Sequence, residues 1–301
     1  MVREISSAKS RFLSDLASIN DRMNRAQRDV ASGKRVHAAS DSPDQVSALL
    51  TVRSELSSLQ QTQANLNRTG TELSAAEQAL QSAVKLFDRV RTLGMTGASG
   101  VHTAATRKSI ADELGAILER FVGLANTDVD GRNLFSGDAD RQFAYSIDLS
   151  NSPPWSAYQG TTSSRRAIHP TGVPFAVAKT AQEIFDNSDP SKNVFVAIET
   201  LRQALLANDE SAIQTAMAPL AGVSEHLNSM LSFYGFAQAQ VTEAKDTAAQ
   251  MVLLRKTQIS ALEDADITEA IMELQQARFQ QEAAYKVQAS LPQGSLFDYL
   301  G

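Results

Sequence analysis

The sequence of 301 residues contains no cysteine, and its four histidines are scattered. Without cysteine there are no disulfide bonds, thiolate metal sites or cysteine nucleophiles. None of the histidines has the spacing of a metal-binding H-E-x-x-H motif, and no P-loop, dinucleotide-binding fingerprint or G-x-S-x-G elbow occurs. We therefore expect a protein that is not an enzyme, with no catalytic residues, no metal and no cofactor.

Clusters of positive charge and long apolar runs are also missing. The net charge is −6, and no run of Lys and Arg exceeds two residues, so we expect no nucleic-acid partner. The longest apolar stretches, such as 173–178, are too short to cross a bilayer, so we expect no membrane insertion. The first residues lack the apolar core of a cleaved secretory signal. The protein therefore either stays inside the cell or leaves it without such a signal.

Aromatic residues are few, at 6 %, and only one of them is Trp. Much of the apolar content is alanine, which buries little area per residue and suits thin helical bundles better than a thick core. Five of the eight prolines and the only Trp lie between residues 130 and 190. Helix-breaking residues are thus concentrated in one segment.

The N-terminal half has apolar residues at alternating spacings of four and three, typical of heptad-patterned helices. The first such helix should end near Gly33, and Ser42-Pro43-Asp44-Gln45 predicts the start of the next. Its stripe continues from about Val46 to Leu93, roughly 70 Å at about 1.5 Å per residue. A helix of that length needs partner helices along its whole length. A loop at 94–103 and a further helix across residues 110–124 follow.

The C-terminal half returns to helical patterns over Val194–Leu206 and from Asn208 to about Leu262. Pro219 should kink the second pattern or mark its true start. Asp266 and Glu269 predict the start of the last helix. We call the apolar stripes near the two ends of the chain the terminal seams, and we expect them to pair because neither is stable alone. Their members are Phe12, Leu16, Ile19, Met23, Val30, Ile267, Ile271, Leu274, Val287 and Leu291.

The segment between the two helical halves favours β-structure. Phe143–Leu149, Arg165–His169 and Val173–Val177 are candidate strands separated by turn residues. The predicted fold is mainly α, a long antiparallel helical bundle or coiled coil formed by the N- and C-terminal halves, with a small β-rich insertion domain. The predicted parts are a terminal coiled-coil inner domain (1–41 with 263–301), a helical bundle domain (42–135 with 186–262) and a small β-rich outer domain (136–185).

Three charged groups have a structural interpretation that we prefer to a chemical one. The acids at 263–266 could pair as general acid and base, but acids are also favoured near a helix start by its dipole. Asp138-Ala-Asp140 lacks the further ligands and the glycine of a calcium loop, and we expect a solvated turn. Arg165-Arg166 are expected to be solvent-facing strand residues.

Residues 31–43 resemble the N-terminal region of flagellins and flagellin-like hook proteins. The family pattern is S-G-K-R followed, after a short gap, by S-D-D-P. Ser32-Gly33-Lys34-Arg35 supplies the first half, and Ser40-Asp41-Ser42-Pro43 the second. Ser42 replaces the second aspartate of the pattern, and both residue types cap helices.

A second resemblance covers residues 124–137, which resemble a segment of the hook–filament junction members of that family (the FlgL type). These residues read Leu-Ala-Asn-Thr-Asp-Val-Asp-Gly-Arg-Asn-Leu-Phe-Ser-Gly. That segment reads L-A-N-x…G-R-Y-x-F-x-G, with Asn133 here in place of Tyr. Tyr158-Gln-Gly160 is similar to a following Y-x-G, and residues 283–285 and 295–300 to the closing helix and tail. The matching positions of the second motif are Gly131, Arg132, Phe135 and Gly137.

The resemblance implies a structural component of the bacterial flagellum, a hook-associated adaptor that joins the hook to the flagellin filament. The implied partners are copies of the chain itself in a ring, a neighbouring hook-associated protein, flagellin and a cytoplasmic export chaperone. The implied location is the extracellular hook–filament junction, reached by type III export without a cleaved signal peptide. The alternatives are a short filament flagellin, against which residues 132–137 and the tail argue, and a cytoplasmic coiled-coil scaffold, against which residues 33–43 and the insertion argue.

Overall fold

The computed structural model describes residues 2–38, 40–100 and 102–290, with side chains from residue 10 onward. Contacts divide the chain into two compact units, which we call the terminal unit (Met1–Ser58 with Met251–Gly301) and the central unit (Leu59–Gln250). The elements are α1 (Val2–Ser32), α2 (Pro43–Gly97), α3 (Ala104–Ala125), β1 (Asp128–Val129), β2 (Arg132–Asn133), β3 (Arg166–Ile168), β4 (Pro174–Ala176), α4 (Ala181–Phe185), α5 (Val194–Leu206), α6 (Glu210–Met217), α7 (Leu220–Glu263) and α8 (Ile267–Ser290).

The chain is mainly helical, with small antiparallel sheets formed by β1 with β2 and by β3 with β4, which confirms the predicted fold class. The division into separate inner, bundle and insertion domains stays a prediction. No proline lies between Pro43 and Pro153, so α2 runs uninterrupted for 55 residues. The helix starts at Pro43 and after Pro219, and the helix end before Gly33, are confirmed.

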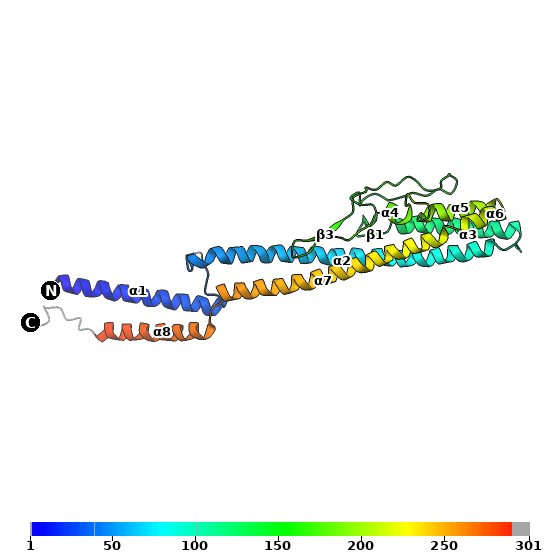
Figure 1. Cartoon of the computed structure of the whole chain (residues 1–301). Coiled ribbons are helices and arrows are strands. Elements are labelled where there is room, and N and C mark those ends of the chain that lie inside the picture. Colours follow the sequence, from blue (N-terminus) through cyan, green and yellow to red (C-terminus); the bar gives the residue numbers. More distant parts are fainter. Residues whose placement is uncertain (1, 39, 101, 291–301) are drawn as a thin grey trace, which may run out of the picture. The chain divides into compact units, whose positions relative to one another are not determined.

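In the terminal unit, α1 and α8 lie side by side (Figure 1). Polar side chains also join them: Arg22 Nη2 donates to Gln280 Oε1 at 2.7 Å, and Gln281 Nε2 donates to Asn20 Oδ1 at 2.7 Å. These pairs are 258 and 261 positions apart in the sequence. The expected pairing of the two ends of the chain is therefore present.

The central unit contains the aromatic core. The Phe135 ring packs edge-to-face on Phe185 and on Tyr234, with centroids 6.2 Å away in both cases. Phe121 joins Phe87 to Phe185 by two further edge contacts. Edge-to-face pairs stabilise a core beyond the area they bury. The buried aromatic residues thus gather in the central unit, where they come from α2, α3, α4, α5, α7 and the chain after β2.

Two of the predicted strands are confirmed as β3 and β4, but the prediction for Phe143–Leu149 is wrong. That segment makes one isolated bridge, between Ile147 and Trp155. Its backbone makes three hydrogen bonds with residues 154–159, and a side chain holds it as well. Tyr145 N–H donates to Asn126 Oδ1, and Asn126 Nδ2 donates to the Tyr145 carbonyl at 2.7 Å. An asparagine amide carries one donor group and one acceptor, so it substitutes for a neighbouring strand.

The hairpin of β1 and β2 was not predicted, although the sequence contains a signal for it. The two residues between the strands, Asp130 and Gly131, have φ of 54° and 74°. Asp-Gly is typical of the two-residue turn that needs positive φ at both positions. The loop predicted at 94–103 also begins late, since α2 continues to Gly97. A Cβ at Gly94 or Gly97 would collide with Met217 or Leu205, so these glycines permit close helix packing instead of ending the helix.

Candidate functional site: the helix junction and the base of the insertion

The S-G-K-R motif forms a junction with the connection between α7 and α8. Gly33, with φ of 71°, ends α1, and its carbonyl accepts from Ala265 N–H at 3.0 Å. Arg35 N–H donates to the Glu263 carbonyl at 2.7 Å, and Lys34 pairs with Asp264 as an antiparallel bridge. The connection after the first helix is therefore hydrogen-bonded to the connection before the last. We call residues 32–43 and 262–266 the junction.

Glu263 is the buried charge at the centre of the junction. Its side chain is 3 % exposed, and it forms ion pairs with Lys34 Nζ and with Arg53 Nη2, the latter at 2.5 Å. Burial opposes ionisation of the carboxyl, but the hydrogen bonds from Lys34 and Arg53 and their charges outweigh it, so the pKa of Glu263 lies below its usual value. The acids at 263–266 thus have a structural role, in which the first one is paired and buried.

The second half of the motif shapes the chain between α1 and α2. Asp41 Oδ2 accepts from the backbone N–H groups of His37 and Ala38 at 2.9 and 2.8 Å, and these hydrogen bonds lower the pKa of Asp41. The carboxylate therefore closes a turn directly before Pro43, where α2 begins. Arg35 Nη2 donates to Gln45 Oε1 at 3.2 Å, and Ser40 is exposed.

The N-terminal seam lies on the inner face of α1. Its five predicted residues (Phe12, Leu16, Ile19, Met23 and Val30) are half-buried, and Ala26 between them is 1 % exposed. The C-terminal seam differs from the prediction. The inner face of α8 carries Ala270, Leu274, Ala277 and Ala284 at spacings of four, three and seven.

Of the predicted C-terminal seam residues, only Leu274 lies on that inner face. Ile267, Ile271 and Val287 are 40, 40 and 59 % exposed, so their assignment to the face that pairs with α1 is wrong. Small residues at 270 and 277 let the two helices approach closely, and this moves the contact stripe away from the larger apolar residues. Leu291 lies outside the described residues. A role of the seams in assembly stays a prediction.

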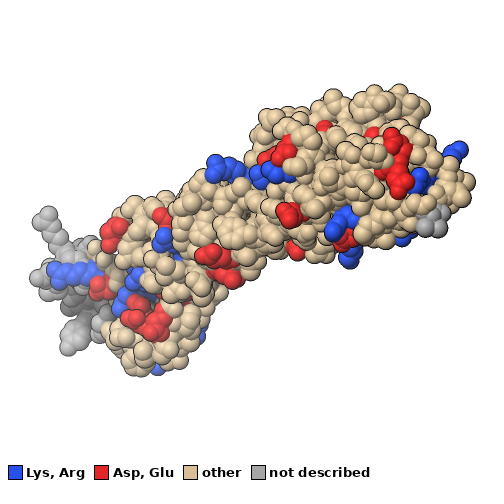
Figure 2. Space-filling model, turned by 45° about the vertical axis from the view of Figure 1, so that its right-hand side comes forward, with Lys and Arg blue, Asp and Glu red and all other residues tan. Residues whose placement is uncertain are grey.

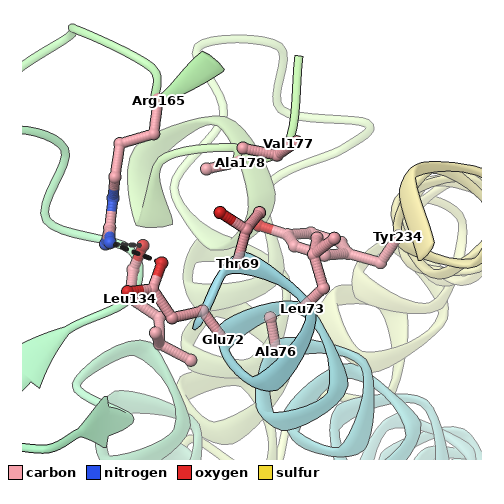
Figure 3. A pocket seen from close by; sticks show the side chains of 9 residues that line it. All are labelled: Thr69, Glu72, Leu73, Ala76, Leu134, Arg165, Val177, Ala178 and Tyr234. Atoms are coloured by element: carbon pink, nitrogen blue, oxygen red, sulfur yellow. Dashed lines mark hydrogen bonds and ion pairs between the residues drawn. The ribbon is translucent and has the colours of Figure 1, made fainter. Parts of the chain in front are cut away.

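Arg132 and Arg165 anchor the base of the insertion on α2. Arg132 forms ion pairs with Asp140 at 2.6 Å and with Glu72 at 4.0 Å. Arg165 Nη1 lies 3.0 Å from Glu72 Oε2, and Arg165 Nη2 donates to the Leu134 carbonyl (Figure 3). Arg165 Nη2 also donates to the Asn133 carbonyl. The expectation that Arg165 faces solvent and that Asp140 lies in a solvated turn is therefore wrong. Arg166 is exposed, as predicted.

The remaining positions of the second motif are structural as well. Phe135 is fully buried in the aromatic core, and its carbonyl accepts from the Tyr158 hydroxyl at 3.0 Å. Burial raises the pKa of Tyr158 to about 12. Gly137 has φ of 64°, and a Cβ there would collide with Thr161. Asn126, the asparagine of the L-A-N part of the same motif, holds the Tyr145 backbone with its side-chain amide.

The chemistry available at these sites is electrostatic and hydrogen-bonding. Among the described residues, no three His, Asp or Glu side chains gather in a way that could hold a metal ion. No helix within that part of the chain is long and apolar enough to cross a membrane. Figure 2 shows small groups of both charge signs separated by wide uncharged areas on the face in view. Helices and loops are held together by the ion pairs and hydrogen bonds of the junction and of the insertion base.

Comparison with known proteins agrees with the two motifs. Residues 6–140 match the family model for the bacterial flagellin N-terminal helical region, and residues 217–300 match the model for the C-terminal helical region. Together the two matches cover well over half of the chain, which therefore belongs to the flagellin family. It is a structural protein of the bacterial flagellum.

Two of the curated relatives are longer flagellins. Polar flagellin F of Vibrio parahaemolyticus is 26 % identical over 123 residues, which are 40 % of this chain and 33 % of that protein. Flagellin B of Helicobacter pylori is 24 % identical over 141 residues, which are 46 % of this chain and 27 % of that protein. The chain thus matches a third or less of the length of these relatives.

Two solved structures share the fold along almost their whole length. A Vibrio parahaemolyticus protein described as a flagellar hook-associated protein has a TM-score of 0.64 and 22 % identity, covering 74 % of this chain and all of that one. Hook-associated protein 3 of Legionella pneumophila has a TM-score of 0.62 and 15 % identity, covering 70 % of this chain and 98 % of that one. At these identities the likeness establishes the fold.

Proposed function

We propose that this chain is the hook-associated adaptor that joins the hook to the flagellin filament, acting as a ring of identical subunits outside the cell. The observation that carries the proposal is the segment 124–137. This segment resembles the junction members of the flagellin family. Its Arg132 and Phe135, together with Arg165, hold the insertion on α2 and in the aromatic core. A filament flagellin is not expected to need this particular base.

The extent of the structural likeness supports the same proposal. The shared fold covers the two hook-associated proteins at 100 and 98 % of their length. A short chain with a small insertion fits a connecting layer that carries no large outer domain. In the adaptor, the terminal coiled coil (1–41 with 263–301) is the inner part, and the insertion (136–185) is the outer part.

The terminal seams supply the contacts between subunits in this proposal. The α1–α8 pair buries mostly alanine, so it gains little from burial alone and is stabilised by neighbouring copies. The partners are copies of the chain, a second hook-associated protein on the hook side and flagellin on the filament side. A cytoplasmic chaperone would keep the ends from associating before export through the flagellar type III route.

Deletion of the coding sequence tests the adaptor role. We expect cells with completed hooks, no filament, and flagellin released into the medium. Immunogold labelling of intact wild-type flagella should mark one band at the distal end of the hook. Labelling along the whole filament would favour the alternative, a short filament flagellin, and normal filaments in the deletion strain would refute the junction role.

A further inference from the structure

The central unit contains a groove with an arginine rim. The groove lies between α2 and β3 and has a volume of about 490 Å³. Leu66, Ala167 and Val177, all buried, line it with apolar side chains. Its charged lining consists of Arg68, Arg132, Arg165, Arg166, Glu72 and Asp138.

The arginines of the rim differ in their partners. Arg132 and Arg165 are occupied by Glu72 and, for Arg132, by Asp140. Within the described part of the chain, neither Arg68 nor Arg166 has a carboxylate partner, and Arg68 Nη2 reaches only the Asn65 amide oxygen at 3.4 Å. Asp138 offsets part of this charge. Two exposed, flexible guanidinium groups over an apolar floor favour an anionic partner.

The outer face of α7 has the complementary charge. The inner face of α7 buries Val241, Ala244 and Ala248, so Glu243 and Asp246 point away from the core and are exposed. Neither carboxylate has an ion-pair partner among the described residues. Because they are three residues apart on a helix, they lie on neighbouring positions of one surface.

These two surfaces stand at the same level of the central unit. The Lys245 side chain, between the two acids in sequence, lies against Gly70 of α2, and Gly70 is two residues from Arg68. Subunits of a closed ring are related by rotation about one axis. If the helices run along that axis, a patch and its complement on the neighbour must lie at the same height. The two charged surfaces meet this condition.

We propose that the Arg68–Arg166 rim of one copy receives Glu243 and Asp246 of the adjacent copy, and that this is a lateral contact between subunits. The inference rests on the ring of the proposed function. The occupant is a second copy of this chain because the complementary pair of carboxylates is present on the chain at the matching level.

Cysteine cross-linking tests the contact directly, since the native chain contains no cysteine. The test pair is Arg166→Cys with Asp246→Cys, in flagella isolated from cells expressing the full chain. Treatment with a short bismaleimide should give dimers and a ladder of higher multimers. The single variants and the control pair Arg166→Cys with Glu119→Cys, an exposed carboxylate on α3, should remain monomeric. Monomer alone from the test pair, or an equal ladder from the control pair, would overturn the proposal.

Charge reversal gives an independent readout. Arg68→Glu with Arg166→Glu, or Glu243→Arg with Asp246→Arg, should each reduce the protein retained on isolated hooks on the order of tenfold, because like charges then face one another. Combining all four substitutions should restore retention, while purified chains melt normally. Loss that the combined variant does not restore would contradict the contact. Immunogold labelling distinguishes failure of this contact from failure of the adaptor role. If the wild-type protein is absent from the hook end, the adaptor role is refuted. If it is present there but the test pair gives no cross-links, only this contact is refuted.

Discussion

The two units of this chain achieve order in different ways. The central unit buries Phe87, Phe121, Phe135, Phe185 and Phe195 in one aromatic cluster, whereas the described part of the terminal unit fully buries only Ala26, Leu49, Ala270 and Ala277 among its apolar residues. At about 25 cal/mol per Å² of apolar surface, alanines offset little of an ordering entropy of roughly 1–2 kcal/mol per residue. The comparison shows that two paired helices can each carry a regular stripe of apolar residues and still bury too little apolar surface to form a stable core.

The largest effect that the comparison predicts is in the central core. Phe135→Ala should lower the free energy of unfolding by about 3–5 kcal/mol, because it removes a fully buried ring that contacts two others. Phe236→Ala is the matched control, since Phe236 is 63 % exposed and should change stability by no more than about 0.5 kcal/mol. Urea denaturation of the purified chain measures both. Equal effects would mean that the central core is not where stability resides.

The second prediction concerns the terminal seams. Ile19→Asp or Leu274→Asp should leave the melting curve of the purified monomer near that of the wild type and abolish its capture onto isolated hooks. Burying an unpaired polar group costs on the order of 2–7 kcal/mol of free energy, and the assembled seam would bury the new carboxylate. The monomer avoids this cost because we expect its ends to be unstructured in solution. Gln275→Asp, at an exposed position of α8, is the control. A large fall in monomer melting temperature would show that the seams belong to the monomer's core.

Proteolysis and hydrogen exchange sharpen the same point. Limited proteolysis of the monomer should trim it to about residues 45–260, because the ends lack neighbours in solution. Strong exchange protection of amides in 5–30 and 267–290 would contradict this.

The third prediction uses pH at the junction. Glu263→Gln should weaken retention on isolated hooks by about 1–2 kcal/mol at pH 7. The effect is limited because the partners of Glu263, Lys34 and Arg53, are about half exposed to solvent. The pKa of Glu263 in the folded protein lies below the ordinary 4.5, so its stabilisation is present above pH 4.5 and is lost as pH falls through the lowered value. The difference between wild type and variant should therefore disappear in acid. A difference that grows as pH falls would refute this assignment.

The smallest predicted effects come from two glycines with open space around them. Gly33→Ala should destabilise the junction by about 1 kcal/mol because φ is 71°, a conformation unfavourable for alanine. Gly123→Ala, within α3, should stabilise the central unit by about 0.5–1 kcal/mol through helix propensity. Melting of the purified chain measures the second, and retention on isolated hooks measures the first.

Local signals in the sequence predicted most of the fold. Proline and glycine at 43 and 33 marked helix boundaries because backbone sterics act within a few residues. The inner face of α8 could not be predicted in the same way, because it is defined by close approach to α1 and not by hydrophobicity. The role of Arg165 depends on Glu72, 93 positions away, and that of Glu263 on Arg53, 210 positions away. The fold brings these partners together, and the spacing of residues along the chain does not predict which distant residues will meet.

The hydrogen bonds between residues 33–36 and 263–265 have a consequence for biosynthesis. The motif at Gly33 leaves the ribosome long before its partner Glu263 exists, so the junction forms only after the more than two hundred residues between them have been made. A chain cut short before residue 263 would still contain every aromatic residue of the central core. It would fold centrally and yet remain unable to close the junction. The terminal unit can therefore be completed only after residues 263–265 have been added to the chain.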